Sequence, residues 1–214
     1  MKTIALVAGG PKENLADLTI FNQREIMWVG IDRGVRYIEE AGFTPANAFG
    51  DFDSISSEEH KKLKKDLPHL STYPSEKDQT DTEIALEWAI NQRPDQIYLF
   101  GATGGRIDHM LANLYLLMKS PSTLSKIECI DRQNHITLYG PGTYKVKRKN
   151  ELRYISFIAL TPDVVGLTLE GFKYPLKNCH IRLGSTLCIS NELIYEVGTF
   201  SFLDGILIMI RSRD

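Results

Sequence analysis

The sequence of 214 residues has few cysteines, no long apolar run and little net charge. Its three cysteines, Cys129, Cys179 and Cys188, are too few and too scattered for a disulfide framework or a structural zinc site, and they indicate a reducing compartment. The apolar stretch near the N-terminus has about six residues, far short of the ~18 that span a membrane. A net charge of −2 gives no broad attraction to nucleic acid or anionic lipid. We therefore expect a cytoplasmic protein that binds neither nucleic acid nor membrane.

Two common phosphate-binding motifs are also missing from the chain. It contains no G-x-x-x-x-G-K-[ST] loop and no G-x-G-x-x-G fingerprint. A nucleotide ligand would therefore have to be held by a different kind of loop.

The first half of the chain alternates short apolar runs with segments of helical periodicity. The apolar runs lie at residues 3–10, 25–34, 47–50 and 96–101, and each ends in or near glycine. Helical patterns follow at 36–42, 56–67, 80–92 and 108–120, and Thr80 and Glu83 have capping-box spacing. This alternation predicts an α/β domain, with a parallel, Rossmann-like sheet and helices on both of its faces.

The second half changes character from about residue 130. Short β-type runs are separated by glycine and proline turns, for example at 135–142, 153–160 and 205–212, and helical periodicity is lost. This pattern predicts a small antiparallel sandwich or barrel. We expect two packed domains, residues 1–130 and 131–214.

Acids and glycines gather in the loops that leave the predicted parallel strands. These loops are GGP (9–11), DRG (32–34), GDFDS (50–54) and GATGGRIDH (101–109). Ligands of open parallel sheets bind at the carboxyl ends of the strands, near a switch in strand order. The sequence therefore predicts its ligand site at that end of the sheet.

Asp51 and Asp53 flank Phe52 in the GDFDS loop. In an extended segment, residues two apart point the same way, so both carboxylates could hold one cation. Carboxylates together with phosphate oxygens are ligands that Mg²⁺ prefers. The alternative is that one aspartate caps the following helix and the other is solvated.

Asp78 and Asp81 lie three residues apart in DQTD, a spacing that makes them neighbours on a helix surface. Acids in a first helical turn also complement the helix dipole, so a helix start is the simpler interpretation.

The stretch GATGGRIDH is more specific. Its glycines allow turns whose N–H groups can cradle phosphate at the start of a helix. Arg106 can pair with phosphate through two hydrogen bonds. Asp108 can orient a metal, accept a proton or cap the helix, and His109 is a helix-face residue or a polar contact to a nucleotide.

The ordered set GDFDS, KDQTD and GATGGRIDH, followed by an apolar helix, resembles the thiamine pyrophosphokinase family. VAGG and IDRG near the start, and ISNE with GILIMIRS near the end, extend the resemblance over nearly the whole chain. It implies an α/β domain followed by a β-sandwich in a homodimer. It also implies a Mg²⁺-dependent transferase, a kinase that moves a diphosphate from ATP to the hydroxyl group of thiamine and releases AMP.

The resemblance also implies roles for individual residues. Asp51, Asp53 and Asp81 would hold Mg²⁺, and Asp78, Asp108 and Arg106 would be catalytic, with Arg106 on the triphosphate. ATP would be contacted by Asp32, Gly34, Lys77, Thr103, Gly104, Arg106 and His109, and thiamine by Ser190 and Asn191.

One departure from the family concerns the thiamine side. Animal members carry a tryptophan near the C-terminus that packs on thiamine, whereas Trp28 and Trp88 both lie in the first domain here. Phe200 or Phe202 would take its place, because a flat ring can stack on the cationic thiazolium.

Two rival functions remain open on the residues alone. One is another Mg²⁺-dependent phosphotransferase or phosphatase that uses a D-x-D pair, and the other is a non-catalytic sensor of thiamine or nucleotide. Apposed carboxylates destabilise a fold unless something binds between them, which speaks against a sensor.

Overall fold

The computed structural model describes residues 2–21, 25–50, 70–72 and 78–214, and of residues 70–72 and 121–122 only the backbone. The chain folds as two compact units, Met1–Arg132 and Gln133–Asp214. None of the helices in the described part is long and apolar enough to cross a membrane. The helical pattern at 56–67 lies outside the described residues.

The first unit is built on a parallel sheet of six strands. They are β1 (Thr3–Val7), β2 (Ile26–Ile31), β3 (Asn47–Gly50), β4 (Leu70–Thr72), β5 (Gln96–Phe100) and β6 (Lys126–Ile130). The order is β4-β3-β2-β1-β5-β6, and every pair within it is parallel. All five residues of β1 and of β5 are buried, as expected for central strands covered on both faces.

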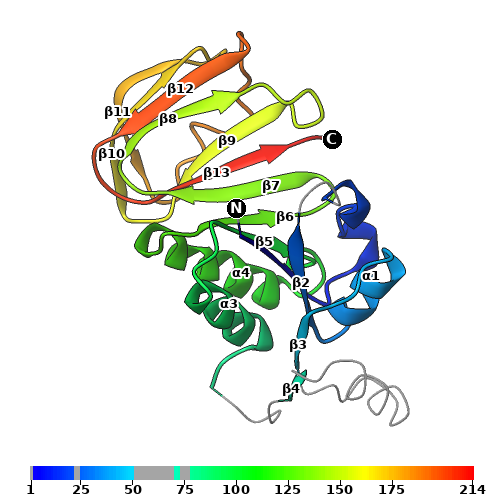
Figure 1. Ribbon diagram of the computed structural model, residues 1–214. Coiled ribbons are helices and arrows are strands. Elements are labelled where there is room, and N and C mark those ends of the chain that lie inside the picture. The colour runs from blue at the N-terminus through cyan, green and yellow to red at the C-terminus, as the bar shows by residue number, and fades with distance from the viewer. Residues whose placement is uncertain (1, 22–24, 51–69, 73–77) are drawn as a thin grey trace. The chain divides into compact units, whose positions relative to one another are not determined.

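Helices cover both faces of this sheet, as predicted. They are α1 (Gly34–Glu40), α3 (Asp81–Asn91) and α4 (Ile107–Leu116), with short 3₁₀ turns at Lys12–Asn14, Leu18–Phe21 and Leu117–Ser122. Figure 1 shows α1 on one face and α3 with α4 on the other.

The helix ends follow from local sequence. Thr80 is the N-cap of α3, and its hydroxyl accepts a hydrogen bond from the backbone N–H of Glu83, which is one half of the expected capping box. Gly42 follows α1 with a φ of +83°, and its N–H donates to the carbonyl of Glu39. A left-handed glycine of this kind is a common way to end a helix.

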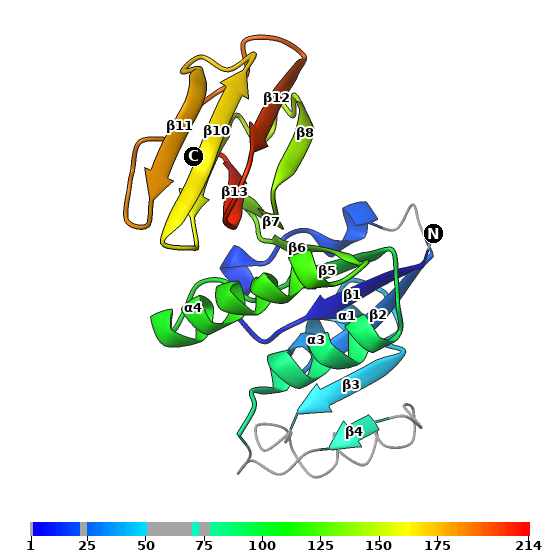
Figure 2. The same ribbon diagram turned by 90° about the vertical axis from the view of Figure 1, so that its left-hand side faces the viewer.

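All regular secondary structure of the second unit is β-strand. Strands β7 (Asn134–Tyr139), β13 (Leu207–Ser212) and β9 (Tyr154–Ala159) pair in that order and are antiparallel. A second sheet has the order β11 (Leu176–Arg182), β10 (Asp163–Glu170), β12 (Val197–Phe202) and β8 (Gly142–Lys147). Figure 2 shows the strands of the second sheet side by side.

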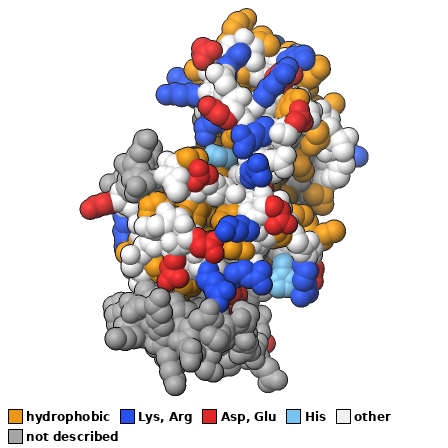
Figure 3. Space-filling model, turned by 90° about the vertical axis from the view of Figure 1, so that its right-hand side faces the viewer, with side chains coloured by type: hydrophobic (Ala, Val, Ile, Leu, Met, Phe, Trp, Pro, Cys, Tyr) orange, Lys and Arg blue, Asp and Glu red, His pale blue; other side chains and the backbone are white. Residues whose placement is uncertain are grey.

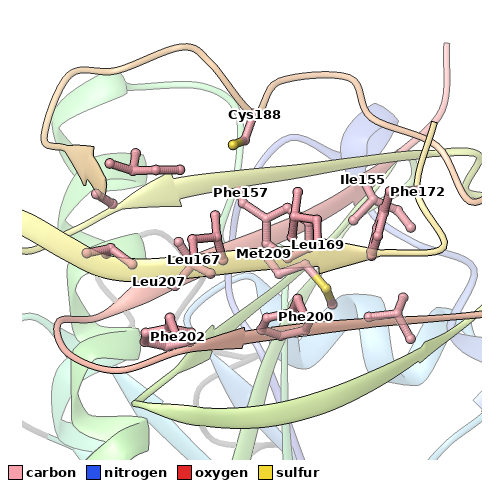
Figure 4. Packing of buried hydrophobic residues seen from close by; sticks show 14 of the residues in the cluster. Ile155, Phe157, Leu167, Leu169, Phe172, Cys188, Phe200, Phe202, Leu207 and Met209 are labelled. Carbon is pink, nitrogen blue, oxygen red and sulfur yellow. The ribbon is translucent and has the colours of Figure 1, made fainter. Parts of the chain in front are cut away.

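The core of the second unit lies between these two sets of strands. Phe157 and Met209 from one set meet Leu167 and Phe200 from the other, all at most 5% exposed (Figure 4). Burying one such side chain stabilises the fold by roughly 1.5–3 kcal/mol. The α/β class with a smaller all-β sandwich is therefore confirmed.

Candidate active site

A groove of about 770 Å³ opens in the first unit where β1, β2 and β5 end. The strand order switches direction at β1, because β2 continues the sheet on one side and β5 on the other. This is the position at which open parallel sheets bind their ligands. The groove is lined by residues 8–13, by Ile31, Asp32, Arg33, Tyr37 and Thr82, and by residues 101–106, His109, Met110 and Asn113.

Glycines allow the groove's loops to approach one another closely. The N–H of Gly10 donates to the carbonyl of Gly101 at 2.9 Å, and a Cβ at Gly10 would lie 2.3 Å from that oxygen. A Cβ at Gly34 would lie only 1.7 Å from the carbonyl oxygen of Val7. No side chain fits at either position, so Gly34, expected as a nucleotide contact, has a packing role where α1 begins beside β1.

Asp32 lines the groove directly after β2. Its φ of +50° is uncommon for a residue other than glycine and marks a tight turn. Its N–H donates to the carbonyl of Phe49 at 2.9 Å. Its Oδ1 lies so close to Gly50 that a Cβ there would approach it to 2.1 Å. Gly50 thus lies beside the carboxylate of Asp32, and Asp51, the first acid of GDFDS, is the next residue in the sequence.

Two side chains hold the loop that follows β5. The buried hydroxyl of Thr103 donates to Oδ2 of Asp131 at 2.7 Å. Nδ2 of Asn113 on α4 donates to the carbonyl of Ala102 at 3.0 Å. The hydroxyl of Thr103 therefore helps to shape the loop, and Thr103 also lines the groove, so its contact to nucleotide stays a prediction. Gly104, in a left-handed turn with a φ of +78°, lines the groove.

Arg106 and Asp108 form a bidentate ion pair at the start of α4. Nη2 and Nε of Arg106 donate to Oδ2 and Oδ1 of Asp108 at 2.6 and 3.1 Å. The hydrogen bonds from Arg106 are the largest cause, and a hydrogen bond from the N–H of His109 the second, of a pKa of Asp108 lowered to about 2. Asp108 is therefore ionised at neutral pH, and it is not the N-cap, which is Arg106.

The remaining predicted acids lie near α3 or outside the described chain. Asp81 is the first residue of α3 and is half-buried, and its neighbour Thr82 lines the groove, whereas Asp78 is exposed. Asp51, Asp53 and Lys77 lie outside the described residues. Among the residues that the structure does describe, no three acidic, histidine or cysteine side chains lie close enough to hold a metal ion.

The two phenylalanines expected to stack on thiamine lie in the core of the second unit. Phe200 is 0% exposed and contacts the rings of Tyr139, Tyr144 and Phe157, and Phe202 is 2% exposed (Figure 4). Both side chains point inward from β12, because residues two apart in a strand share a face. Neither ring offers a surface to a ligand.

The side chain of Asn191 also has a structural role, because its hydrogen bonds go to the backbone of this unit. It is 2% exposed, and its Oδ1 accepts from the N–H groups of Tyr174 and Glu192 while its Nδ2 donates to the carbonyl of Tyr174. Its neighbour Ser190 is exposed, with a φ of +57°. The two hydrogen bonds between Asn191 and Tyr174 clamp the backbone of Tyr174 next to the segment that contains Ser190, and the side chain of Tyr174 is exposed.

Two residues that build the site carried no signal in the sequence: Tyr37, which lines the groove, and Asp131, which lies behind one of its loops. Tyr37 donates its hydroxyl to the carbonyl of Gly10 at 3.0 Å, and Asp131 holds Thr103. Each lies 27 or 28 residues from its partner. Such contacts exist only once the strands are paired, and only a relative of known structure could have indicated them.

The fold and the groove define an open α/β protein with a ligand-type groove at its strand-order switch and a second, all-β domain. The comparison with known families agrees with this class. Residues 19–130 match the model described as "Thiamin pyrophosphokinase, catalytic domain", and residues 143–207 match "Thiamin pyrophosphokinase, vitamin B1 binding domain".

Full-length relatives lead to the same family. The chain is 55% identical to the thiamine pyrophosphokinase of Bacillus subtilis (strain 168) over 100% of both chains. The crystal structure of thiamine pyrophosphokinase from Bacillus subtilis matches with a TM-score of 0.93 and 54% identity over 100% of both chains. That of Geobacillus thermodenitrificans matches with a TM-score of 0.90 and 53% identity, covering 99% of this chain and 98% of the other. The chain belongs to the thiamine pyrophosphokinase family, whose members are transferases that convert ATP and thiamine to AMP and thiamine diphosphate.

Replacing Arg106 with Gln should raise the pKa of Asp108 from about 2 toward its ordinary value of 3.8, because the guanidinium is the main cause of the shift. The lowered pKa stabilises the folded state above the unfolded pKa, and this contribution is lost as the pH falls through about 2. An NMR titration that follows the side-chain carboxyl carbon of Asp108 measures this pKa as the midpoint of its titration. Arg33→Gln, which removes the same charge from the same groove, should leave it unchanged. An unshifted midpoint in R106Q would contradict the pairing.

Proposed function

We propose that this chain transfers a diphosphate from ATP to the hydroxyl group of thiamine, giving thiamine diphosphate and AMP. The observation that carries the proposal is the groove at the strand-order switch of the first unit, in a chain that both family models match. In this proposal, residues 1–130 bind ATP and metal, and residues 131–214 bind thiamine and form the dimer together with helix α4 of the first unit.

ATP would lie in the groove beside the loops after β1, β2 and β5. Gly104 and His109 line the groove from the third loop, and the guanidinium of Arg106 would pair with phosphate oxygens. Asp32 would contact the nucleotide from the loop after β2. Gly34 and Thr103 would act through the backbone they position, and Lys77 would contact ATP from the DQTD side.

Arg106 has to exchange partners when ATP binds. Its guanidinium is paired with Asp108, and both side chains are well exposed, at 72% and 64%. An exposed ion pair contributes little free energy, so a triphosphate can compete for the guanidinium. The exchange would free Asp108 to orient the thiamine hydroxyl, and Asp78 would help to position the same group.

Mg²⁺ would be held by Asp51, Asp53 and Asp81. Carboxylate oxygens are suitable donors for this ion, and two observations support their meeting at the groove: Gly50 ends β3 against Asp32, and Thr82, next to Asp81, lines the groove. When bound, Mg²⁺ neutralises the negative charge of the phosphates and helps to align them.

The thiamine contacts of the second unit are proposed to be Ser190 and the ring of Tyr174. Phe200 and Phe202 are buried, whereas Tyr174 is 57% exposed and is clamped by Asn191. Nζ of Lys173 lies 5.6 Å from the centre of the Tyr174 ring, so the ring already accepts a cation. The positively charged thiazolium could use the same interaction.

A homodimer is supported by an uncovered face of α4. Ile107, Leu111 and Tyr115, spaced four residues apart and so on one helix face, are 69%, 46% and 60% exposed, and none of the α4 residues is buried. Such an apolar stripe is typical of a surface that packs against a second copy. A cytoplasmic location is supported by Cys129, Cys179 and Cys188, which are all free thiols.

The reaction is tested with purified protein, ATP, Mg²⁺ and thiamine, followed by chromatography of nucleotides and thiamine esters. AMP should appear only when thiamine is present, in step with thiamine diphosphate. ADP with thiamine monophosphate would mean transfer of a single phosphoryl group. Phosphate released without thiamine would favour a phosphatase, and thiamine binding without any nucleotide product would favour a sensor.

Asp53→Asn should lower kcat by about a hundredfold or more, because a bound metal contributes several kcal/mol of charge stabilisation to the transition state. Circular dichroism should show an intact fold. Asp95→Asn makes the same change at the opposite, amino end of β5, and it should leave kcat unaltered. Full activity in a folded D53N protein would remove Asp53 from the proposed metal site.

Tyr174→Ala should raise KM for thiamine by about fivefold, the size expected for loss of one cation–π contact. KM for ATP should not change. Tyr195→Ala is the matched control, because Tyr195 is also an exposed tyrosine of the same unit, at 66% against 57% for Tyr174. Equal effects of the two variants on thiamine would exclude a specific role for Tyr174.

Leu111→Asp should weaken dimerisation by about a hundredfold or more, because it would bury an unpaired carboxylate between copies. Light scattering coupled to gel filtration gives the mass over a dilution series. Leu124→Asp is the control, since Leu124 is 98% exposed and lies outside α4. Dimers of unchanged stability in L111D would show that the α4 face is not the interface.

A further inference from the structure

A second, smaller pocket lies entirely within the second unit. Its volume is about 290 Å³, and it is formed by the segment that joins β8 to β9, by residues 192–193 and by β13. Four cationic side chains line it: Arg148, Lys149, Arg153 and Arg211. Glu192 is the one carboxylate of the lining, and Oε1 of Glu196, which is outside the lining, lies 3.6 Å from Nε of Arg148.

The single carboxylate is shared with a cation outside the pocket. Oε2 of Glu192 lies 2.5 Å from Nε of Arg153, and its Oε1 lies 3.1 Å from Nζ of Lys173. Lys173 does not line the pocket. Two carboxylates, Glu192 and Glu196, are therefore outnumbered by five cationic side chains, the four of the lining and Lys173.

Two of the guanidinium groups are held in place by backbone carbonyls. Nη2 of Arg148 donates to the carbonyl of Leu193 at 2.8 Å, and Nη2 of Arg211 donates to the carbonyl of Lys147 at 2.5 Å. Arg211 is 7% exposed, so it is a buried charged group in the pocket wall. Figure 3 shows Lys and Arg side chains gathered on one face of this unit, with acidic side chains among them.

These features suit a small anion with several phosphate oxygens. Guanidinium groups bind phosphate through paired hydrogen bonds, and groups fixed in advance lose little conformational entropy on binding. The volume is at the lower limit of small-molecule sites, which span roughly 300–1,000 Å³. We propose that this pocket is a second anion site that binds a diphosphate group. None of its cationic side chains belongs to the set proposed above for ATP, metal or thiamine.

The test is an NMR titration of the full-length, ¹⁵N-labelled chain with inorganic diphosphate, without added metal. Saturable shifts are expected at the amides of residues 148–153 and at the Nε–H signals of Arg148, Arg153 and Arg211. Shifts at residues 8–13 and 101–106 would report the groove of the first unit separately, so failure of one site does not decide the other. Raising the salt concentration should weaken binding at the second site, because exposed charges are screened.

Arg153→Gln and Lys149→Gln remove exposed charges at the pocket and should each lower its affinity by about tenfold, the equivalent of one charged hydrogen bond. Lys177→Gln removes the same charge from the same unit outside the pocket and should leave the affinity unchanged. Thermal unfolding should confirm that all three variants fold.

Thiamine diphosphate serves as a second probe and separates the two sources of the group. Shifts at residues 148–153 with this compound, lost in R153Q, would identify an organic diphosphate as a ligand. Shifts with inorganic diphosphate alone would identify the free anion. Absence of saturable shifts at residues 148–153 with both probes would overturn the proposal. So would equal losses of affinity in K177Q and K149Q, since these would indicate diffuse attraction only.

Discussion

The candidate active site depends on how closely three backbone segments approach one another at the carboxyl end of the parallel sheet. The contact between Gly10 and Gly101, with a hydrogen bond of 2.9 Å, leaves no room for a side chain at Gly10. Gly34 packs against Val7 in the same way. With these approaches, the loops after β1, β2 and β5 surround one groove. Bulkier residues would force the loops apart and enlarge or disrupt it.

Around this backbone frame, polar side chains divide into those that build the site and those that face it. Thr103, Asp131, Tyr37 and Asn113 use their hydrogen bonds on the loops themselves. The Arg106–Asp108 pair, in contrast, is exposed and keeps two opposite charges ready beside the groove. A site arranged like this can exchange an internal ion pair for contacts to a charged ligand without loss of fold, because exposed ion pairs contribute little to stability.

The second unit follows a different physical rule. Its stability comes from aromatic and aliphatic side chains packed between two sets of strands, which include Phe157, Phe172 and Phe200. Much of its polar chemistry lies on segments outside those strands, and Arg211 on β13 is an exception. Asn191 fixes Tyr174, and the segment after β8 gathers cationic side chains. A rigid core that presents functional groups on its connecting segments is a general feature of sandwich folds.

The sequence by itself determined the local elements and the family. Apolar runs ending in glycine predicted β1, β2, β3 and β5 of the first unit, and Thr80 predicted the start of α3, because these signals act over a few residues. Only the tertiary structure decided which side chains are available. Phe200 and Phe202 are aromatic residues two apart on β12, and nothing local tells which face of a strand is buried. The roles of Thr103, Asn191 and Tyr174 likewise depend on partners 17 to 28 residues away, which strand pairing and chain packing bring together.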